Sequence, residues 1–188
     1  MRKLIQQYAK DLTAGRLASG YEHSYRIYQL ARKIGEGMEY DDEVLHAACF
    51  LHDIEMSSGH PRSSAEKARS ILEETGFTPG SIEAVYQAIL CHMPGEEGEV
   101  PEEEPSIEGQ LLHDANLLET LGAIGLIRLS IGSFFWNHLK TMGEVVELLK
   151  RWRGYAETFY VPKARRLARR RIDFLDQAIS RFEEELAL

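Results

Sequence analysis

The chain has 188 residues, of which 44% are hydrophobic and 28% charged. This balance fits a folded globular protein and excludes a disordered or low-complexity one. The formal net charge of −8 argues against a partner that is a nucleic-acid polymer, because such binding needs Lys and Arg to neutralise phosphates. We find no apolar run of about 18 residues and no signal-peptide core, so we expect a cytoplasmic protein without a membrane partner.

Apolar residues recur at helical spacing along most of the chain, and no segment alternates with the period of two that is typical of strands. We therefore predict an all-α fold in a single domain over 1–188. Only the segment 93–105, with three Pro and six Glu, predicts a long solvated loop. The predicted helices cover, in chain order, about 2–14, 21–35, 42–53, 65–75, 79–92, 105–119, 123–139, a broken stretch at 142–160, and 162–188.

Polar side chains of the types that bind metals fall on helix faces that are otherwise apolar. His23 shares its face with apolar residues four, seven and eleven positions later, and His52 follows apolar residues three, four and seven positions earlier. Asp114 has leucines three positions before and four after it. Asp53 directly follows His52. A buried carboxylate without a partner is costly, so each of these groups needs one.

One divalent ion held by His23, His52, Asp53 and Asp114 would satisfy all four groups. Consecutive helical residues point about 100° apart, so His52 and Asp53 can reach one ion only where a helix ends. Two histidines and two carboxylates do not select one metal, so manganese, magnesium, cobalt, iron and nickel all fit. The alternative is that both histidines are ordinary core residues hydrogen-bonded to carboxylates, and the spacing alone leaves both possibilities open.

Three stretches of the sequence, taken together, resemble a known family. YEHSYRIYQLA is followed by AACFLHDIE and later by EGQLLHDANLLETLGAIGLIR, which resembles the H…HD…D motif of the HD-domain superfamily of metal-dependent phosphohydrolases. The resemblance covers about residues 20–130 and is closest to the small stand-alone branch. It implies an HD-domain helical bundle, here with an additional C-terminal helix in an extension over about 142–188.

The resemblance also implies an activity, namely hydrolysis of a small phosphorylated substrate such as a nucleotide or deoxynucleotide. An ion in such a site activates water and polarises the phosphoryl oxygens. Asp53 is then both a ligand and a catalytic residue, while His23, His52 and Asp114 are ligands.

Further residues near the motif are candidates for substrate contacts or catalysis. His60, Arg62 and Ser63 follow the HD pair in an expected loop and are the first candidates for phosphate contacts, although Arg62 can equally be a solvated cation. His92 lies at the end of its helix, on the inward face. It can be a general acid, a ligand of a second metal or a packed core residue. Arg128 can bind phosphate or pair with an acid near the site.

The chain also departs from the family pattern. Glu55 replaces the glycine of the common HDIG form, and DANLLE carries Asn116 and Glu119 where the family has carboxylates of its DAD-x-L-D pattern. Together with Met56, where relatives carry a catalytic Glu, these changes keep open a metal-stabilised binding protein without turnover. A di-iron oxygenase of the same superfamily is a further alternative, which would need His92, with or without His60, to complete a second metal site. A homodimer is compatible with the sequence but is not required by it.

Overall fold

The computed structural model describes residues 1–56, 60–93, 104–135 and 138–187. All regular secondary structure in these ranges is helical, which confirms the predicted all-α fold. The elements are α1 (Arg2–Leu12), α2 (Tyr21–Ile34), α3 (Asp42–Leu51), α4 (His60–Glu74), α5 (Pro79–Leu90), α6 (Ile107–Thr120), α7 (Ala123–Phe135), α8 (Met142–Gly154), the 3₁₀ helix η2 (Tyr155–Thr158) and α9 (Pro162–Leu186).

The helix starts follow from local capping chemistry. The carboxylate of Asp41 accepts hydrogen bonds from the backbone N–H groups of Glu43 and Val44 and so caps α3. Thr78 caps α5 in the same way, directly before a proline that suits the first helical position. One start differs from the expectation, because α4 begins at His60 and not near residue 65. A proline in the first turn of a helix costs no backbone hydrogen bond, so Pro61 does not delay this start.

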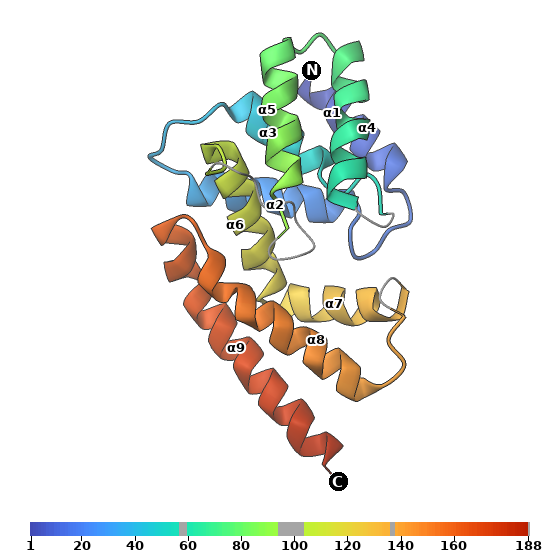
Figure 1. The fold of residues 1–188 in the computed structure, drawn as a ribbon, viewed down its shortest axis with the longest axis vertical. Coiled ribbons are helices and arrows are strands. Elements are labelled where there is room, and N and C mark those ends of the chain that lie inside the picture. The colour runs from blue at the N-terminus through green and yellow to red at the C-terminus, as the bar shows by residue number, and fades with distance from the viewer. Residues whose placement is uncertain (57–59, 94–103, 136–137, 188) are drawn as a thin grey trace.

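Two helices form the centre of the molecule (Figure 1). Eight of the ten residues of α3 are buried, and so are eleven of the fourteen residues of α6. Because these helices are enclosed on nearly all sides, their polar side chains must find partners inside the protein.

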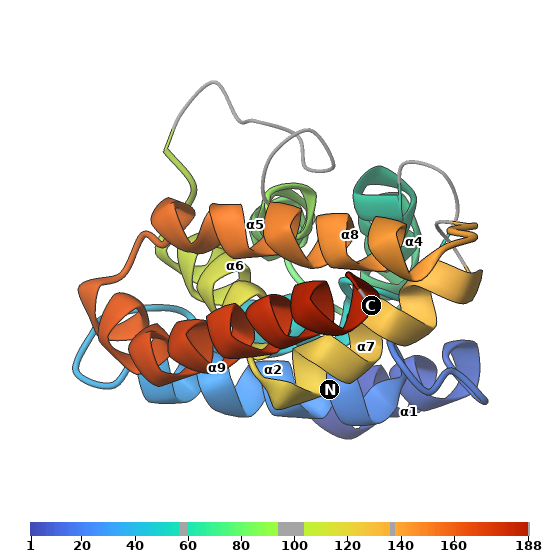
Figure 2. The same cartoon turned by 90° about the horizontal axis from the view of Figure 1, so that it is seen from below.

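The C-terminal helices lie against this centre. Figures 1 and 2 both show α8 and α9 running side by side along one edge of the molecule. One contiguous cluster of buried apolar residues includes members from every helix between α1 and α9 except α7, from which Leu126 and Leu129 pack against it. The C-terminal extension is thus packed onto the same core as the segment that carries the motif.

No single helix in the described ranges is long and apolar enough to cross a membrane. The helix α6 and residues 123–132 of α7 pass that test only as a pair, which is bent by 86°.

The bend between α6 and α7 depends on Gly125. A Cβ atom at this position would lie 1.8 Å from the backbone oxygen of Thr120, so a larger residue cannot be accommodated without moving the backbone. The close approach of the two helices turns α7 back toward α2. Arg128, one turn later on α7, is thereby brought within hydrogen-bonding distance of His23.

A buried histidine in the core should make the protein sensitive to acid. His46 is 1% exposed and packs against the rings of Phe50 and Tyr28. Burial, together with the nearby charge of Arg2, lowers the pKa of His46 to about 4. Since an unfolded histidine titrates near 6.5, the unfolded state binds the extra proton first as the pH falls.

The stabilisation from neutral His46 is therefore complete above pH 6.5 and is lost as the pH falls toward 4. We expect His46→Phe to remove about 3 kcal/mol of this pH dependence. Urea denaturation at several pH values measures it, and parallel stability curves for the wild type and the variant would contradict the expectation.

Candidate metal centre

The end of α3 places His52 and Asp53 on the same side of the chain. The helix ends at Leu51, and the next two residues lie in a turn. The guanidinium of Arg16 donates hydrogen bonds to the backbone oxygens of Asp53 and Ile54, at 3.0 and 3.2 Å. These bonds hold the turn in place beyond the last helical residue. The adjacent side chains can therefore converge, as the sequence analysis requires for a shared ion.

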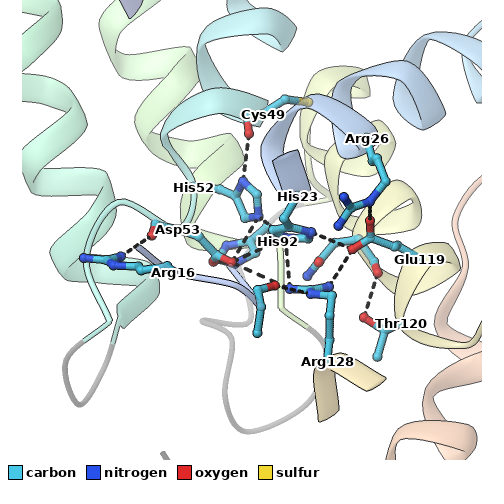
Figure 3. A network of polar contacts seen from close by, with 12 residues as sticks. Arg16, His23, Arg26, Cys49, His52, Asp53, His92, Glu119, Thr120 and Arg128 are labelled. Carbon is cyan, nitrogen blue, oxygen red and sulfur yellow. Dashed lines mark hydrogen bonds and ion pairs between the residues drawn. The ribbon is translucent and has the colours of Figure 1, made fainter. Parts of the chain in front are cut away.

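Three residues from two helix ends form a tight buried cluster (Figure 3). His23, in the first turn of α2, faces the pair that follows α3. The Nε2 atoms of His23 and His52 are 3.1 Å apart, and Oδ2 of Asp53 lies 3.4 Å from the first and 3.5 Å from the second. Both histidines are at most 1% exposed and Asp53 is 7% exposed. The three ligand atoms lie within 4.8 Å of one another, a geometry consistent with a divalent metal ion.

In both histidine rings, the hydrogen bond made by Nδ1 determines which nitrogen carries the proton and which has the lone pair. Nδ1 of His52 is 2.9 Å from the backbone oxygen of Cys49, and Nδ1 of His23 is 2.5 Å from the Glu119 carboxylate. Both partners can only accept, so Nδ1 carries the proton in each ring and Nε2 is left with a lone pair. Burial lowers the pKa of His52 to about 3, which keeps this ring neutral at physiological pH.

The donor set fits a divalent ion on chemical grounds. Two proton-free nitrogens and a carboxylate oxygen that point at one another form a set of donors for a cation, whose charge offsets their mutual repulsion. Ligand atoms about 2.1 Å from one ion are about 3.0 Å apart at a right angle and about 3.4 Å apart at the tetrahedral angle. The distances in the cluster, 3.1 to 3.5 Å, lie within about 0.1 Å of this range.

His92 belongs to the same centre. It follows the end of α5, is fully buried, and its Nε2 lies 3.5 Å from Oδ1 of Asp53, the oxygen further from the other two histidines. Its Nδ1 is 2.6 Å from the backbone oxygen of Ile89. The structure thus places His92 beside the cluster.

A charged network on the far side of His23 was not foreseen in the sequence. The carboxylate of Glu119, on α6, accepts hydrogen bonds from His23, Arg26 and Arg128 at 2.5, 2.6 and 2.7 Å. Burial alone would raise the pKa of Glu119, but these partners outweigh it and lower the pKa to about 2. The only signal in the sequence was that Glu119 departs from the family pattern.

Arg128 pairs with this acid and also reaches the cluster. Its Nη2 donates to Nε2 of His23 at 3.1 Å and lies 3.9 Å from Oδ2 of Asp53. Of the two roles expected for Arg128, the ion pair with an acid is present in the structure.

The structure does not bring Asp114 to this cluster, which corrects the expectation that it is the fourth ligand. Its two carboxylate oxygens accept hydrogen bonds from the backbone N–H groups of Tyr160 and Val161, at 3.0 and 2.7 Å. One oxygen also lies 3.1 Å from Nδ1 of His113. Residues five apart on a helix point about 140° from each other, so Asp114 faces the start of α9 while Glu119 faces His23.

Asp114 therefore has a structural role that can be tested. Val161, the N-cap residue of α9, offers no side-chain cap, and the carboxylate on α6 takes up its backbone N–H instead. We expect Asp114→Asn to lower the free energy of unfolding by about 1–3 kcal/mol, because the amide nitrogen cannot accept a hydrogen bond. Divalent metal affinity, measured by calorimetry, should stay within about twofold. A complete loss of metal binding in a folded variant would restore Asp114 as a ligand.

The remaining predicted residues lie at the start of α4. Arg62 is exposed and Ser63 is half-buried, and both belong to the first turn of this helix, not to a loop as expected. His60 is the first residue of α4, and its side chain lies outside the described part of the structure, as do the residues 57–59 before it. Next to them, the hydroxyl of Ser64 bonds both the backbone N–H and the backbone oxygen of Glu55 and so ties α4 to the HD segment.

Comparison with known proteins defines the class. The family model of the HD domain matches residues 20–121, more than half of the chain, and the chain belongs to this family. This confirms the resemblance seen in the sequence.

Particular relatives extend the likeness to the whole chain. It is 25% identical over 199 residues to YpgQ of Bacillus subtilis, an uncharacterised protein, covering 99% of this chain and 92% of YpgQ. The crystal structure of YpgQ in complex with ADP is similar with a TM-score of 0.72 at 20% identity, covering 98% of this chain and 97% of that one. A Lactobacillus plantarum protein gives 0.81 at 22% identity, covering 99% and 96%. An HD-superfamily hydrolase from Bacillus thuringiensis gives 0.69 at 20% identity, also covering 99% and 96%.

Proposed function

We propose that the protein is a metal-dependent phosphohydrolase that acts on a small phosphorylated molecule. The observation that carries this proposal is the convergence of the Nε2 atoms of His23 and His52 on the carboxylate of Asp53, with both Nδ1 protons already donated elsewhere. A divalent ion bound there supplies an acidified water molecule and a Lewis acid for the phosphoryl oxygens.

Different residues of the chain bind the ion, accept the proton and bind the phosphate in the proposed reaction. His23 and His52 hold the ion as neutral donors. Asp53 holds it and accepts the proton of the attacking water, since its carboxylate lies at the centre of the cluster. Arg128 offers Nη2 toward the same centre, where a guanidinium stabilises the negative charge of a phosphate. We also propose that Arg62 and Ser63, at the start of α4, contact the phosphate of the substrate.

We propose two alternative roles for His92, and the number of ions bound per chain decides between them. Its Nε2 lies beside the second carboxylate oxygen of Asp53. With one ion per chain, His92 acts as an acid and base that exchanges a proton with the leaving oxygen or with Asp53. With two ions per chain, His92 and the nearby carboxylate oxygen of Asp53 would hold the second ion.

We propose a nucleotide as the substrate class. The ADP bound in the YpgQ structure supports a nucleoside phosphate, and the half-buried guanidinium of Arg128 beside the cluster suits a phosphate oxygen. Both observations are compatible with nucleoside mono-, di- and triphosphates and their deoxy forms.

A panel of these compounds tests the proposal. The purified protein is incubated with each compound and with manganese, magnesium or cobalt, and released phosphate and pyrophosphate are measured separately. Turnover that depends on the added metal is the expected result. Bound metal without hydrolysis of any compound would favour the non-catalytic binding protein, and oxygen consumption with two bound iron ions would favour the oxygenase.

A further inference from the structure

We infer that Glu119 is a positioning residue for the metal centre, because it holds the His23 ring with its proton on Nδ1 and its Nε2 lone pair toward His52 and Asp53. The inference rests on the proposed metal site and adds to it a residue from a different helix. Glu119 touches neither the cluster atoms of His52 nor those of Asp53, so it acts through His23.

His23 needs a partner that the other two histidines do not need. His52 and His92 follow the ends of α3 and α5, and their Nδ1 atoms bond the backbone oxygens of the residues three positions earlier. Those oxygens belong to the last turn of each helix, where carbonyls have no partner within the helix. His23 lies in the first turn of α2, where the free backbone groups are N–H donors and no free carbonyl is available. Its Nδ1 proton must therefore go to a side chain from elsewhere.

The carboxylate of Glu119 meets this need and is itself held in place. One oxygen, Oε2, accepts from both Nδ1 of His23 and Nη1 of Arg128, and the other, Oε1, accepts from Nε of Arg26. The residue is 1% exposed, so this charge is shielded from water. The guanidinium groups of Arg26 and Arg128 both donate to it, and a carboxylate paired with two such cations is ionised and can only accept.

The network fixes one orientation of the imidazole. Nη2 of Arg128 can only donate, and it points at Nε2 of His23. The partner of Nδ1 can only accept a hydrogen bond, and the partner of Nε2 can only donate one. A ring with its proton on Nε2 would therefore lose both hydrogen bonds. Partners of this kind behind a metal-binding histidine commonly change metal affinity by about 10- to 100-fold when they are removed.

Glu119→Gln tests the inference, because the amide has nearly the same size but only one accepting atom for three donors. In the metal-free full-length protein, nitrogen-15 NMR of the histidine rings should show His23 protonated at Nδ1 in the wild type. In the variant we expect a mixture of the two tautomers. Calorimetry with Mn²⁺ should show an affinity about 10- to 100-fold lower than that of the wild type.

Asp114→Asn is the matched control. It lies on the same helix, is equally buried and also contacts a histidine, but it faces the other side of α6. It should leave both the tautomer of His23 and the Mn²⁺ affinity as in the wild type.

The outcomes separate this inference from the proposed function. A wild-type protein that binds no Mn²⁺ would overturn the proposed function. Unchanged Mn²⁺ affinity and an unchanged tautomer in folded Glu119→Gln would overturn only the role of Glu119. If the variant does not fold, the wild-type spectrum alone still decides, because a proton on Nε2 of His23 contradicts the inference.

Discussion

Asp53→Ala is expected to lower metal-dependent hydrolysis by at least about a thousandfold, since activation of water near neutral pH depends on the bound ion. The carboxylate contacts His23, His52 and His92 together, at 3.4, 3.5 and 3.5 Å. Its loss removes a ligand and the proposed proton acceptor at once. Initial rates on the best substrate of the panel measure the effect, and circular dichroism checks that the helices are retained.

An exposed acidic residue on α9 supplies the control for this variant. Asp173 lies on the outer surface of α9, and Asp173→Ala should have the rate of the wild type. If Asp53→Ala hydrolysed substrate at the normal rate, the cluster would not be the catalytic centre, and the activity would have to be sought elsewhere on the protein.

Removal of the metal is expected to lower the melting temperature by about 5–10 °C. An ion present at 100 times its dissociation constant stabilises the folded state by about 2.7 kcal/mol, and in a chain of this length each kcal/mol is worth about 2–4 °C. The physical reason is local, because the charge of the ion no longer offsets the repulsion between two nitrogen lone pairs and a carboxylate in a buried space. Thermal denaturation with EDTA and with added Mn²⁺ measures the difference.

The same comparison in Asp53→Ala separates a specific site from general effects of the ion. The variant has lost a ligand, so its melting temperature should respond little to EDTA or to Mn²⁺. An equal response in both proteins would mean that the stabilising ion binds at some other position.

The sequence predicts most of this fold because its helices have distinct ends. The helices α3 and α5 begin where the sequence predicted, at Asp42 and Pro79, and the structure shows that Asp41 and Thr78 cap them. The helical spacing of apolar residues identifies the rest. The start of α4 is the exception. The glycine and proline near residue 60 were interpreted as a loop, but a proline is accepted in a first turn as readily as in a loop.

The site was only partly predictable, and α6 shows why. Eleven of its fourteen residues are buried, so an apolar neighbour three or four positions away shows that a side chain is enclosed but not in which direction it points. Asp114 and Glu119 both satisfy that criterion, yet one faces α9 and the other faces His23. The HD pair was predictable because two adjacent ligands require a helix end, and α3 ends there.

Titration of the metal-free protein with Mn²⁺ by calorimetry, in parallel for the wild type and His52→Gln, tests the metal centre most directly. His52 is fully buried, and its Nε2 atom lies 3.1 Å from Nε2 of His23 and 3.5 Å from Oδ2 of Asp53. We predict that the wild type binds at least one ion per chain and that the folded variant binds at least about 100-fold more weakly. Equal binding by both proteins would contradict the assignment of His23, His52 and Asp53 as the metal centre.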